Sequence, residues 1–199
     1  MDYVCSHSLN FLTTPEGCTQ LGVQEIVDLR SHNVEALRTR GIDFSTQYQQ
    51  ALGRGRLQLR LDGTYLLKYS LAESDGQPAT SLLNTQNNPI NLRLRGTVTW
   101  TGQRFGWMGA VNYANSYRDT ATQPNMPISA WMTFDAQLHY DLGADEGGWL
   151  DGTRLEFNAV NLFNRDPPFL NNAIARLGYD QENADPYGRL VSLRIRKNW

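Results

Sequence analysis

Residues 187–199 read Tyr187-Gly-Arg-Leu-Val-Ser-Leu-Arg-Ile-Arg-Lys-Asn-Trp199 and alternate in polarity from one residue to the next. Side chains of a β-strand point alternately to the two faces of a sheet, so this pattern predicts a strand with two unlike faces. One face carries Val191, Leu193, Ile195, Lys197 and Trp199, and the other carries Ser192, Arg194, Arg196 and Asn198. Arginines at two successive inward positions need partners in the dry core of a soluble sandwich, whereas a water-filled lumen accommodates them. The stretch therefore favours a strand between lipid and water.

The segment before this strand predicts a second strand followed by a long irregular loop. Together the two segments resemble the C-terminal end of TonB-dependent outer-membrane receptors. The resemblance is carried by Asn158-Ala-Val-Asn-Leu-Phe-Asn-Arg-Asp-Pro-Pro-Phe169, by Gly178-Tyr-Asp-Gln-Glu-Asn-Ala-Asp-Pro-Tyr-Gly188 and by the final strand ending in Trp199. A weaker similarity extends back through the whole chain.

The resemblance implies that residues 1–199 are the C-terminal part of a 22-stranded barrel whose plug domain and N-terminal strands lie outside this chain. It also implies that the closing strand carries the signal recognised by the barrel-assembly machinery, at Val191, Leu193, Ile195 and Trp199. Lys197 departs from the apolar or aromatic residue more usual in that signal, although its stem can stay apolar while the ammonium reaches water. The N-terminus has no basic segment followed by an apolar core, so the sequence predicts no secretory signal within the chain.

By the same resemblance, the expected function is active uptake of a scarce ligand across the outer membrane of a Gram-negative cell. The ligand classes implied are a ferric siderophore, cobalamin or a carbohydrate. The expected partners are outer-membrane lipid and the TonB system, which such receptors contact through the plug region.

Composition agrees with a barrel that has one apolar and one wet face. Hydrophobic residues make up 40% of the 199 residues, and the mean hydropathy is −0.50. No stretch approaches the roughly 18 apolar residues of a membrane helix, so any membrane crossing must use strands. The formal net charge of −2 gives no sign of nucleic-acid binding.

Period-two alternation predicts an all-β chain of about seven up-and-down antiparallel strands, preceded by a short stub at Asp2-Tyr-Val. The predicted strands cover residues 23–51, 56–70, 90–100, 105–117, 130–142, 154–163 and 187–199. Residues 34–40 have a short helix as the alternative. Long and short connections alternate, which distinguishes the outer from the periplasmic side of an outer-membrane barrel. Seven strands do not close the usual even-stranded barrel, so further strands are expected.

Charged side chains on the polar faces of these strands are candidates for the lumen. They are Arg60, Asp62, Arg93, Arg95, Asp135, His139, Arg194 and Arg196. Asp135 and His139 lie four residues apart, about 13 Å along a strand, so they do not form a direct acid-base pair. On the opposite faces Trp100 and Trp107 flank a short turn, which favours an interfacial aromatic girdle over buried core aromatics.

Cys5 and Cys18 are the only two cysteines and bracket a loop-like segment. Their favoured interpretation is a disulfide that closes an extracellular loop, worth roughly 3 kcal/mol on the chain-entropy argument. Two unrelated free thiols are the alternative. A zinc site is disfavoured because His7 and His32 form no recognisable ligand spacing with the pair.

The sequence contains no nucleotide-binding loop, metal-ligand quartet or nucleophile elbow, so it predicts neither an enzyme nor a bound cofactor. Two other functions stay open. One is a self-contained small outer-membrane barrel with an enzymatic or porin role. The other is a soluble β-barrel or sandwich that acts as a binding module with its apolar face inward.

Overall fold

A computed structural model describes residues 36–72, 78–142, 148–171 and 177–198. The chain divides into two units, residues 1–34 and 35–199, and everything described below belongs to the second unit. Among the described residues no helix is long and apolar enough to cross a membrane. Cys5, Cys18, the stub at Asp2-Tyr-Val and Trp199 lie outside the described residues.

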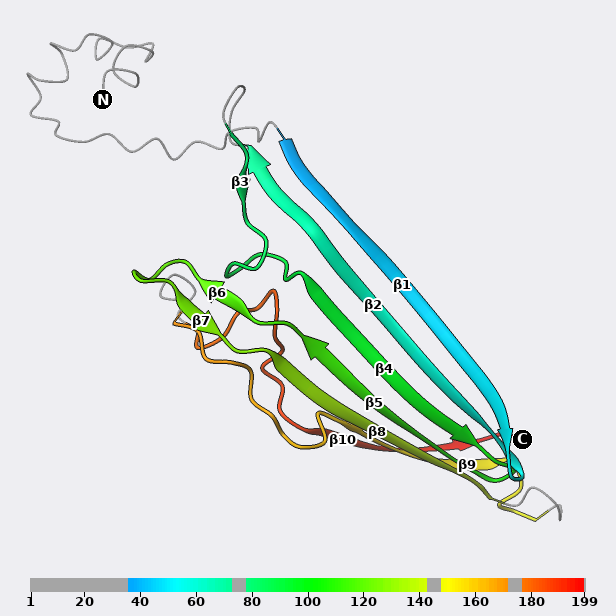
Figure 1. The fold of residues 1–199 in the computed structure, drawn as a ribbon. Helices are drawn as coiled ribbons and strands as arrows, with labels where there is room; N and C mark the ends of the chain where they lie inside the picture. The colour runs from blue at the N-terminus through cyan, green and yellow to red at the C-terminus, as the bar shows by residue number, and fades with distance from the viewer. Residues whose placement is uncertain (1–35, 73–77, 143–147, 172–176, 199) are drawn as a thin grey trace, which may run out of the picture. The chain divides into compact units, whose positions relative to one another are not determined.

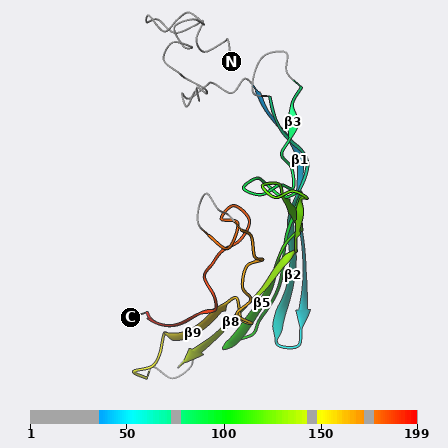
Figure 2. The same cartoon turned by 90° about the vertical axis from the view of Figure 1, so that its left-hand side faces the viewer.

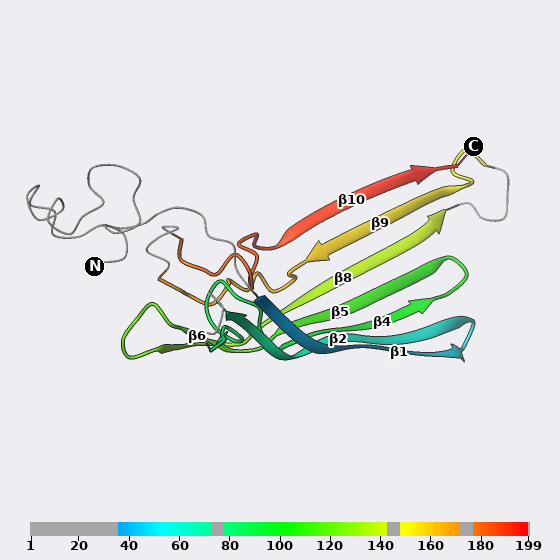
Figure 3. The same cartoon turned by 90° about the horizontal axis from the view of Figure 1, so that it is seen from above.

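Seven strands form one antiparallel sheet in which each strand pairs with the next in sequence (Figures 1 and 3). They are β1 (Ala36–Leu52), β2 (Gly55–Ala72), β4 (Leu92–Thr101), β5 (Phe105–Ala114), β8 (Trp131–Leu142), β9 (Thr153–Val160) and β10 (Leu190–Lys197). The short strand β3 (Thr80–Ser81) pairs with β2, while β6 (Tyr117–Asp119) and β7 (Met126–Ile128) form a separate two-stranded sheet. The predicted all-β, up-and-down arrangement of about seven strands is confirmed.

Several strand boundaries differ from the prediction, and the last strand begins at Leu190 rather than at residue 187. The predicted strand 105–117 ends at Ala114, and Tyr117 belongs instead to β6, which pairs with β7. The predicted strand 154–163 ends at Val160, because Asn161 takes a φ of 51°, a left-handed conformation that breaks the extended chain. Ala36–Leu52 is a strand, so the helix considered for residues 34–40 is wrong for its described part.

Connections between the long strands alternate in length, as predicted. The short connections, at what is here called the short-turn end, cover residues 53–54, 102–104 and 143–152, and the others, at the long-loop end, cover residues 73–91, 115–130 and 161–189. Gly53 and Gly152 have φ values of 59° and 68°, which favour glycine and make the first and last short-turn connections possible. Figure 2 shows the segment between β9 and β10, coloured orange, standing over one side of the sheet.

Strand register gives the sheet two unlike faces. Paired residues of neighbouring strands share a face, and the pairs Leu59↔Val98 and Leu193↔Phe157 lie on what is here called the apolar face. The polar face carries Asp62↔Arg95 and Arg194↔Glu156. Trp100 and Trp107 are directly paired on the apolar face beside the turn that joins β4 and β5, where the sequence predicts them.

The apolar face is not covered by a second layer of the described residues. Leu193 and Ile195 are 70% and 66% exposed on it. The buried apolar cluster lies at the long-loop end, where it consists of Ile90, Ala114, Tyr117, Ile128 and Leu170. The sheet therefore exposes apolar side chains along its strands and packs a small core under its loops.

Close packing on the apolar face predicts unequal effects of two glycine substitutions. A Cβ on Gly63 would meet the Phe44 ring and, at 2.6 Å, a methyl group of Leu94, whereas a Cβ on Gly109 would meet nothing within 4 Å. Gly63→Ala is therefore expected to lower the free energy of unfolding by about 1–3 kcal/mol. Gly109→Ala, the matched control, is expected to change it by less than about 0.5 kcal/mol. Urea unfolding of the membrane-inserted protein measures both, and equal effects would contradict this packing.

Candidate functional site

Polar side chains form a band across the polar face, in which two hydrogen-bonded groups lie side by side in register. The register aligns Ser45, Asp62, Arg95, Asn112 and Thr133 across five neighbouring strands. Ser45 Oγ donates a hydrogen bond to Asp62 Oδ1 at 2.8 Å. Arg60, two residues along the same strand, donates to both Asp62 carboxylate oxygens, from Nε at 2.7 Å and from Nη2 at 2.8 Å. The predicted lumen candidates Arg60 and Asp62 thus form a two-point ion pair.

Asp135 is the hub of the band. Its carboxylate accepts hydrogen bonds from Arg95 Nη1 at 3.0 Å, Asn112 Nδ2 at 2.9 Å and the backbone N–H of Asn161 at 3.2 Å. Arg95 also donates to the Asn112 side-chain oxygen. Because its side chain is only 12% exposed, Asp135 is held by three donors in a mostly water-poor position. It ties β4, β5 and the chain after β9 to β8.

His139 takes no part in that hub. It is paired in register with Gly106 and Glu156, and a side chain on Gly106 would overlap the His139 ring. Asp135 and His139 therefore have separate surroundings, in agreement with their predicted separation along β8.

Ion pairs also join the strands near the short-turn end of the polar face. Arg154 donates to both oxygens of Asp141, at 2.5 and 2.7 Å, and Arg194 lies 3.6 Å from Glu156 Oε2. Arg196 is paired in register with Arg154 and lines a groove beside Asp141. All eight charged candidates predicted from the sequence lie on the polar face of the sheet.

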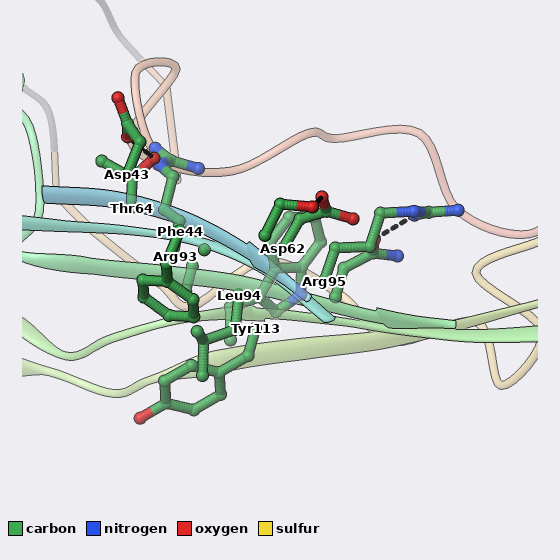
Figure 4. Close-up of a pocket in the computed structure, with 13 residues that line it drawn as sticks. Asp43, Phe44, Asp62, Thr64, Arg93, Leu94, Arg95 and Tyr113 are labelled. Atoms are coloured by element: carbon green, nitrogen blue, oxygen red, sulfur yellow. Dashed lines mark hydrogen bonds between the residues drawn. The ribbon is translucent and has the colours of Figure 1, made fainter. Parts of the chain in front are cut away.

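A groove of about 600 Å³ lies toward the long-loop end of this face, lined by Asp43, Asp62, Thr64, Arg93, Arg95, Asn112 and Trp131, among others (Figure 4). Thr64 Oγ1 donates to Asp43 Oδ1 at 2.6 Å. Figure 4 shows the rings of Phe44 and Tyr113 on the other side of the strands from the Asp43 and Asp62 carboxylates. Trp131, which also lines the groove, has a buried Nε1 without a hydrogen-bond partner among the described residues.

The loop between β9 and β10 covers part of this groove, which the sequence analysis did not predict. Arg93 Nη2, on β4, donates to the backbone oxygen of Glu182 and to Asn183 Oδ1, both at 2.8 Å. To reach β4 from β9 the loop crosses β8 and β5. Arg93 is therefore a link between the sheet and the last loop as well as a groove residue.

Asp180 anchors the same loop from within. It is fully buried and accepts hydrogen bonds from the N–H of Asn87 at 3.0 Å, the N–H of Glu182 at 3.0 Å and Asn183 Nδ2 at 2.9 Å. Asn183 Nδ2 also donates to the backbone oxygen of Asn88 at 2.9 Å. Burial, reinforced by the nearby charge of Asp180, raises the pKa of Tyr117, so its hydroxyl stays protonated in this interior. The loops after β2 and after β9 are thereby joined at one buried carboxylate.

The residues predicted for the assembly signal occupy two environments. Val191, Leu193 and Ile195 are exposed on the apolar face of β10. Lys197, the departure from the expected pattern, donates from Nζ to the backbone oxygens of Trp149, at 2.7 Å, and Asp151. Its ammonium caps the turn between β8 and β9 while its stem follows the apolar face.

Across the described ranges no three His, Cys, Asp or Glu side chains converge as a metal site. The band consists of paired charges and amides. Its chemistry is that of a hydrated binding surface in which ligand hydroxyl, amide or carboxylate groups can exchange with water.

Removing the buried carboxylate is expected to release the last loop. Asp180→Ala removes the acceptor of two part-buried N–H groups and of the buried Asn183 Nδ2, which keeps its bond to the Asn88 backbone oxygen, and each donor left unpaired costs roughly 1–3 kcal/mol. We expect faster amide exchange and protease cleavage in residues 161–189. Asp185→Ala is the matched control, because Asp185 is exposed and accepts only a local bond from the N–H of Tyr187 at 2.9 Å. Equal exchange rates in the two variants would argue against this anchor.

Comparison with known proteins agrees with this architecture. The family described as TonB dependent receptor-like, beta-barrel matches residues 8–162, about three quarters of the chain. The match ends before β10. No curated protein and no solved structure matches the chain. The chain belongs to the TonB-dependent receptor β-barrel family, whose members are transporters of the Gram-negative outer membrane rather than enzymes.

Proposed function

We propose that this sheet is part of the wall of a TonB-energised transport barrel, with its polar face toward the lumen and its apolar face toward lipid. The observation that carries the proposal is the separation of the two faces across all seven long strands. The apolar surface continues from strand to strand, and the polar band crosses β5 at Asn112. Membership of the receptor family implies that the barrel lies in the outer membrane and that transport is energised through TonB.

The energetics of the two faces support this orientation. Placing a side chain such as Leu193 in hydrocarbon rather than water is worth about 1.5–3 kcal/mol. The arginines need the opposite environment, since Arg60 and Arg194 keep 49% and 64% of their side chains exposed. A soluble binding module would have to cover the apolar face, and the described residues provide no such layer.

The two edges of the sheet indicate how the barrel is completed. Within the described residues β1 and β10 each have a neighbouring strand on one side only. Unpaired backbone groups cost several kcal/mol each in hydrocarbon, so further strands must close the barrel. We propose that residues 1–199 supply its C-terminal part, while a plug domain outside this chain provides the contact with TonB.

The proposed ligand is a scarce polar molecule of the ferric siderophore, cobalamin or carbohydrate class. The groove between Asp43 and Arg95 supports a ligand with many hydrogen-bonding groups, because its two carboxylates and two guanidinium groups balance in charge. We further propose that β10 is recognised by the barrel-assembly machinery. A disulfide between Cys5 and Cys18 stays a prediction.

Cysteine labelling tests the orientation of the two faces. Single cysteines at Arg60, Arg95, Asn112 and Arg194 are expected to react with a water-soluble maleimide in the intact barrel, because the lumen is hydrated. Cysteines at the apolar-face positions Leu59, Leu94, Val111 and Leu193 are the matched set and are expected to stay protected by lipid. The reverse pattern would favour a soluble module with its apolar face inward.

Uptake tests the function itself. Cells that express a receptor carrying this chain are expected to accumulate a labelled ferric siderophore, cobalamin or oligosaccharide only when TonB is present, because release into the periplasm requires relayed energy. The 199-residue chain alone is expected to give no uptake, since the proposal assigns the gating plug and the TonB contact to a domain outside it. Recovery of a monomeric, heat-modifiable barrel that imports a ligand from this chain alone would overturn the proposal.

A further inference from the structure

The apolar face is not uniformly filled, because it contains a groove of about 650 Å³. The floor of the groove includes the backbone at Gly96 and Gly109. A Cβ added at Gly109 would meet nothing within 4 Å, and one added at Gly96 would meet only a methyl group of Val111, at 3.2 Å. The missing side chains therefore leave open space on the face that the proposed orientation directs toward lipid.

Large apolar side chains form the walls of this groove. Tyr48, Leu59 and Leu61 come from β1 and β2, and Trp107 comes from β5. Phe134 and Phe163 close another part of the wall, with their rings packed edge to face at a centroid distance of 5.3 Å. The polar side chains of Arg60, Thr97 and Asp135 belong to the other face of the sheet and contribute backbone here. The walls are thus suited to an unbranched hydrocarbon chain.

A cationic side chain stands where the groove reaches the long-loop end. Leu162 and Phe163 line the groove immediately after β9, and Arg189 Nη1 donates to the backbone oxygen of Leu162 at 3.4 Å. Arg189 is exposed and directly precedes β10, whose eight residues extend roughly 27 Å at the usual rise of a strand. Because a tilted strand needs about 9–11 residues to cross the hydrocarbon, the proposed orientation places Arg189 near one boundary, where lipid headgroups are found.

Two neighbouring charges complete this rim. Arg165 is exposed, and its backbone is fixed by the Asn161 side chain through two hydrogen bonds of 2.9 Å. Asp166, which follows Arg165, is also exposed, and the backbone N–H of Arg189 donates to Asn164 Oδ1 at 2.8 Å, next to Arg165 in the sequence. A guanidinium group recognises a phosphate by paired hydrogen bonds as well as by charge. The rim thus has an excess of groups that attract an anionic headgroup.

We infer that this groove binds one acyl chain of an anionic, phosphate-bearing membrane lipid, and that Arg189 contacts the lipid headgroup. The inference rests on the proposed orientation of the apolar face, which the cysteine labelling tests separately. A lipid fits both observations, an apolar groove within the hydrocarbon and a cation at its edge. A second copy of the chain would need no cation at that edge.

Lipid retention by the whole receptor tests the inference. The receptor is extracted from vesicles of phosphatidylcholine and phosphatidylglycerol with identical acyl chains, and native mass spectrometry counts the retained lipids. We expect phosphatidylglycerol to be enriched about fivefold through its contact with Arg189, and Arg189→Gln to remove that enrichment. Gly109→Leu fills the groove and is expected to lower retention of both lipids about tenfold.

Controls separate lipid binding from misfolding. Ile42→Phe adds three carbon atoms at an exposed position of the apolar face outside the groove and is expected to retain lipid like the unmodified receptor. Gly109→Ala, a smaller filling, is expected to give an intermediate loss while keeping the heat-modifiable folded form. Equal retention by Gly109→Leu and Ile42→Phe, an unchanged lipid ratio in Arg189→Gln, or a cross-linked dimer through the groove would each overturn the inference. Reversed cysteine labelling would instead contradict the proposed function.

Discussion

Backbone hydrogen bonding in a medium without water is the constraint on which this structure depends. Every N–H and C=O within the hydrocarbon needs a partner, and adjacent antiparallel strands provide those partners only in a fixed register. Because side chains alternate, that register also decides which face each residue occupies. A shift of one residue between β2 and β4 would turn Asp62 and Arg60 toward lipid and Leu59 and Leu61 toward water. Pairing and polarity therefore stabilise the same arrangement.

The polar band strengthens that register through side chains. The Asp135 carboxylate has partners on β4, on β5 and in the turn after β9, so it holds the relative positions of several strands. Exposed ion pairs contribute little individually, and the 49% exposed Arg60 belongs to that class. Asp135 differs because its side chain is largely shielded, which makes an unpaired donor or acceptor there costly. The band therefore contributes more to the specificity of strand pairing than to the free energy of unfolding.

Strand positions could be predicted from the sequence because their signal is local. Alternation along residues 56–66 and 130–142 is sufficient to assign the faces of β2 and β8, whereas an irregularity between Arg40 and Gly41 shifts the register of β1 and β2 beyond Leu66. The end of β5 could not be predicted, since Tyr113 and Tyr117 share one alternating pattern. Tyr117 leaves the sheet because it pairs with Ile128 of β7 and packs into the loop core. The end of β5 is therefore set by contacts between loops and not by the local sequence pattern.

The loop between β9 and β10 is a second feature that the local sequence pattern could not predict. Asp180 lies in a polar stretch with no periodicity, and its partner Asn87 is 93 residues away in the sequence. Nothing in the neighbourhood of Asp180 distinguishes it from the exposed Asp185. Asp180 becomes an anchor only when the loops after β2 and β9 meet, because burial there removes water as a competing hydrogen-bond partner. In the described sheet, local alternation places the groove residues on the polar face, whereas contacts distant in sequence decide which of them the last loop covers.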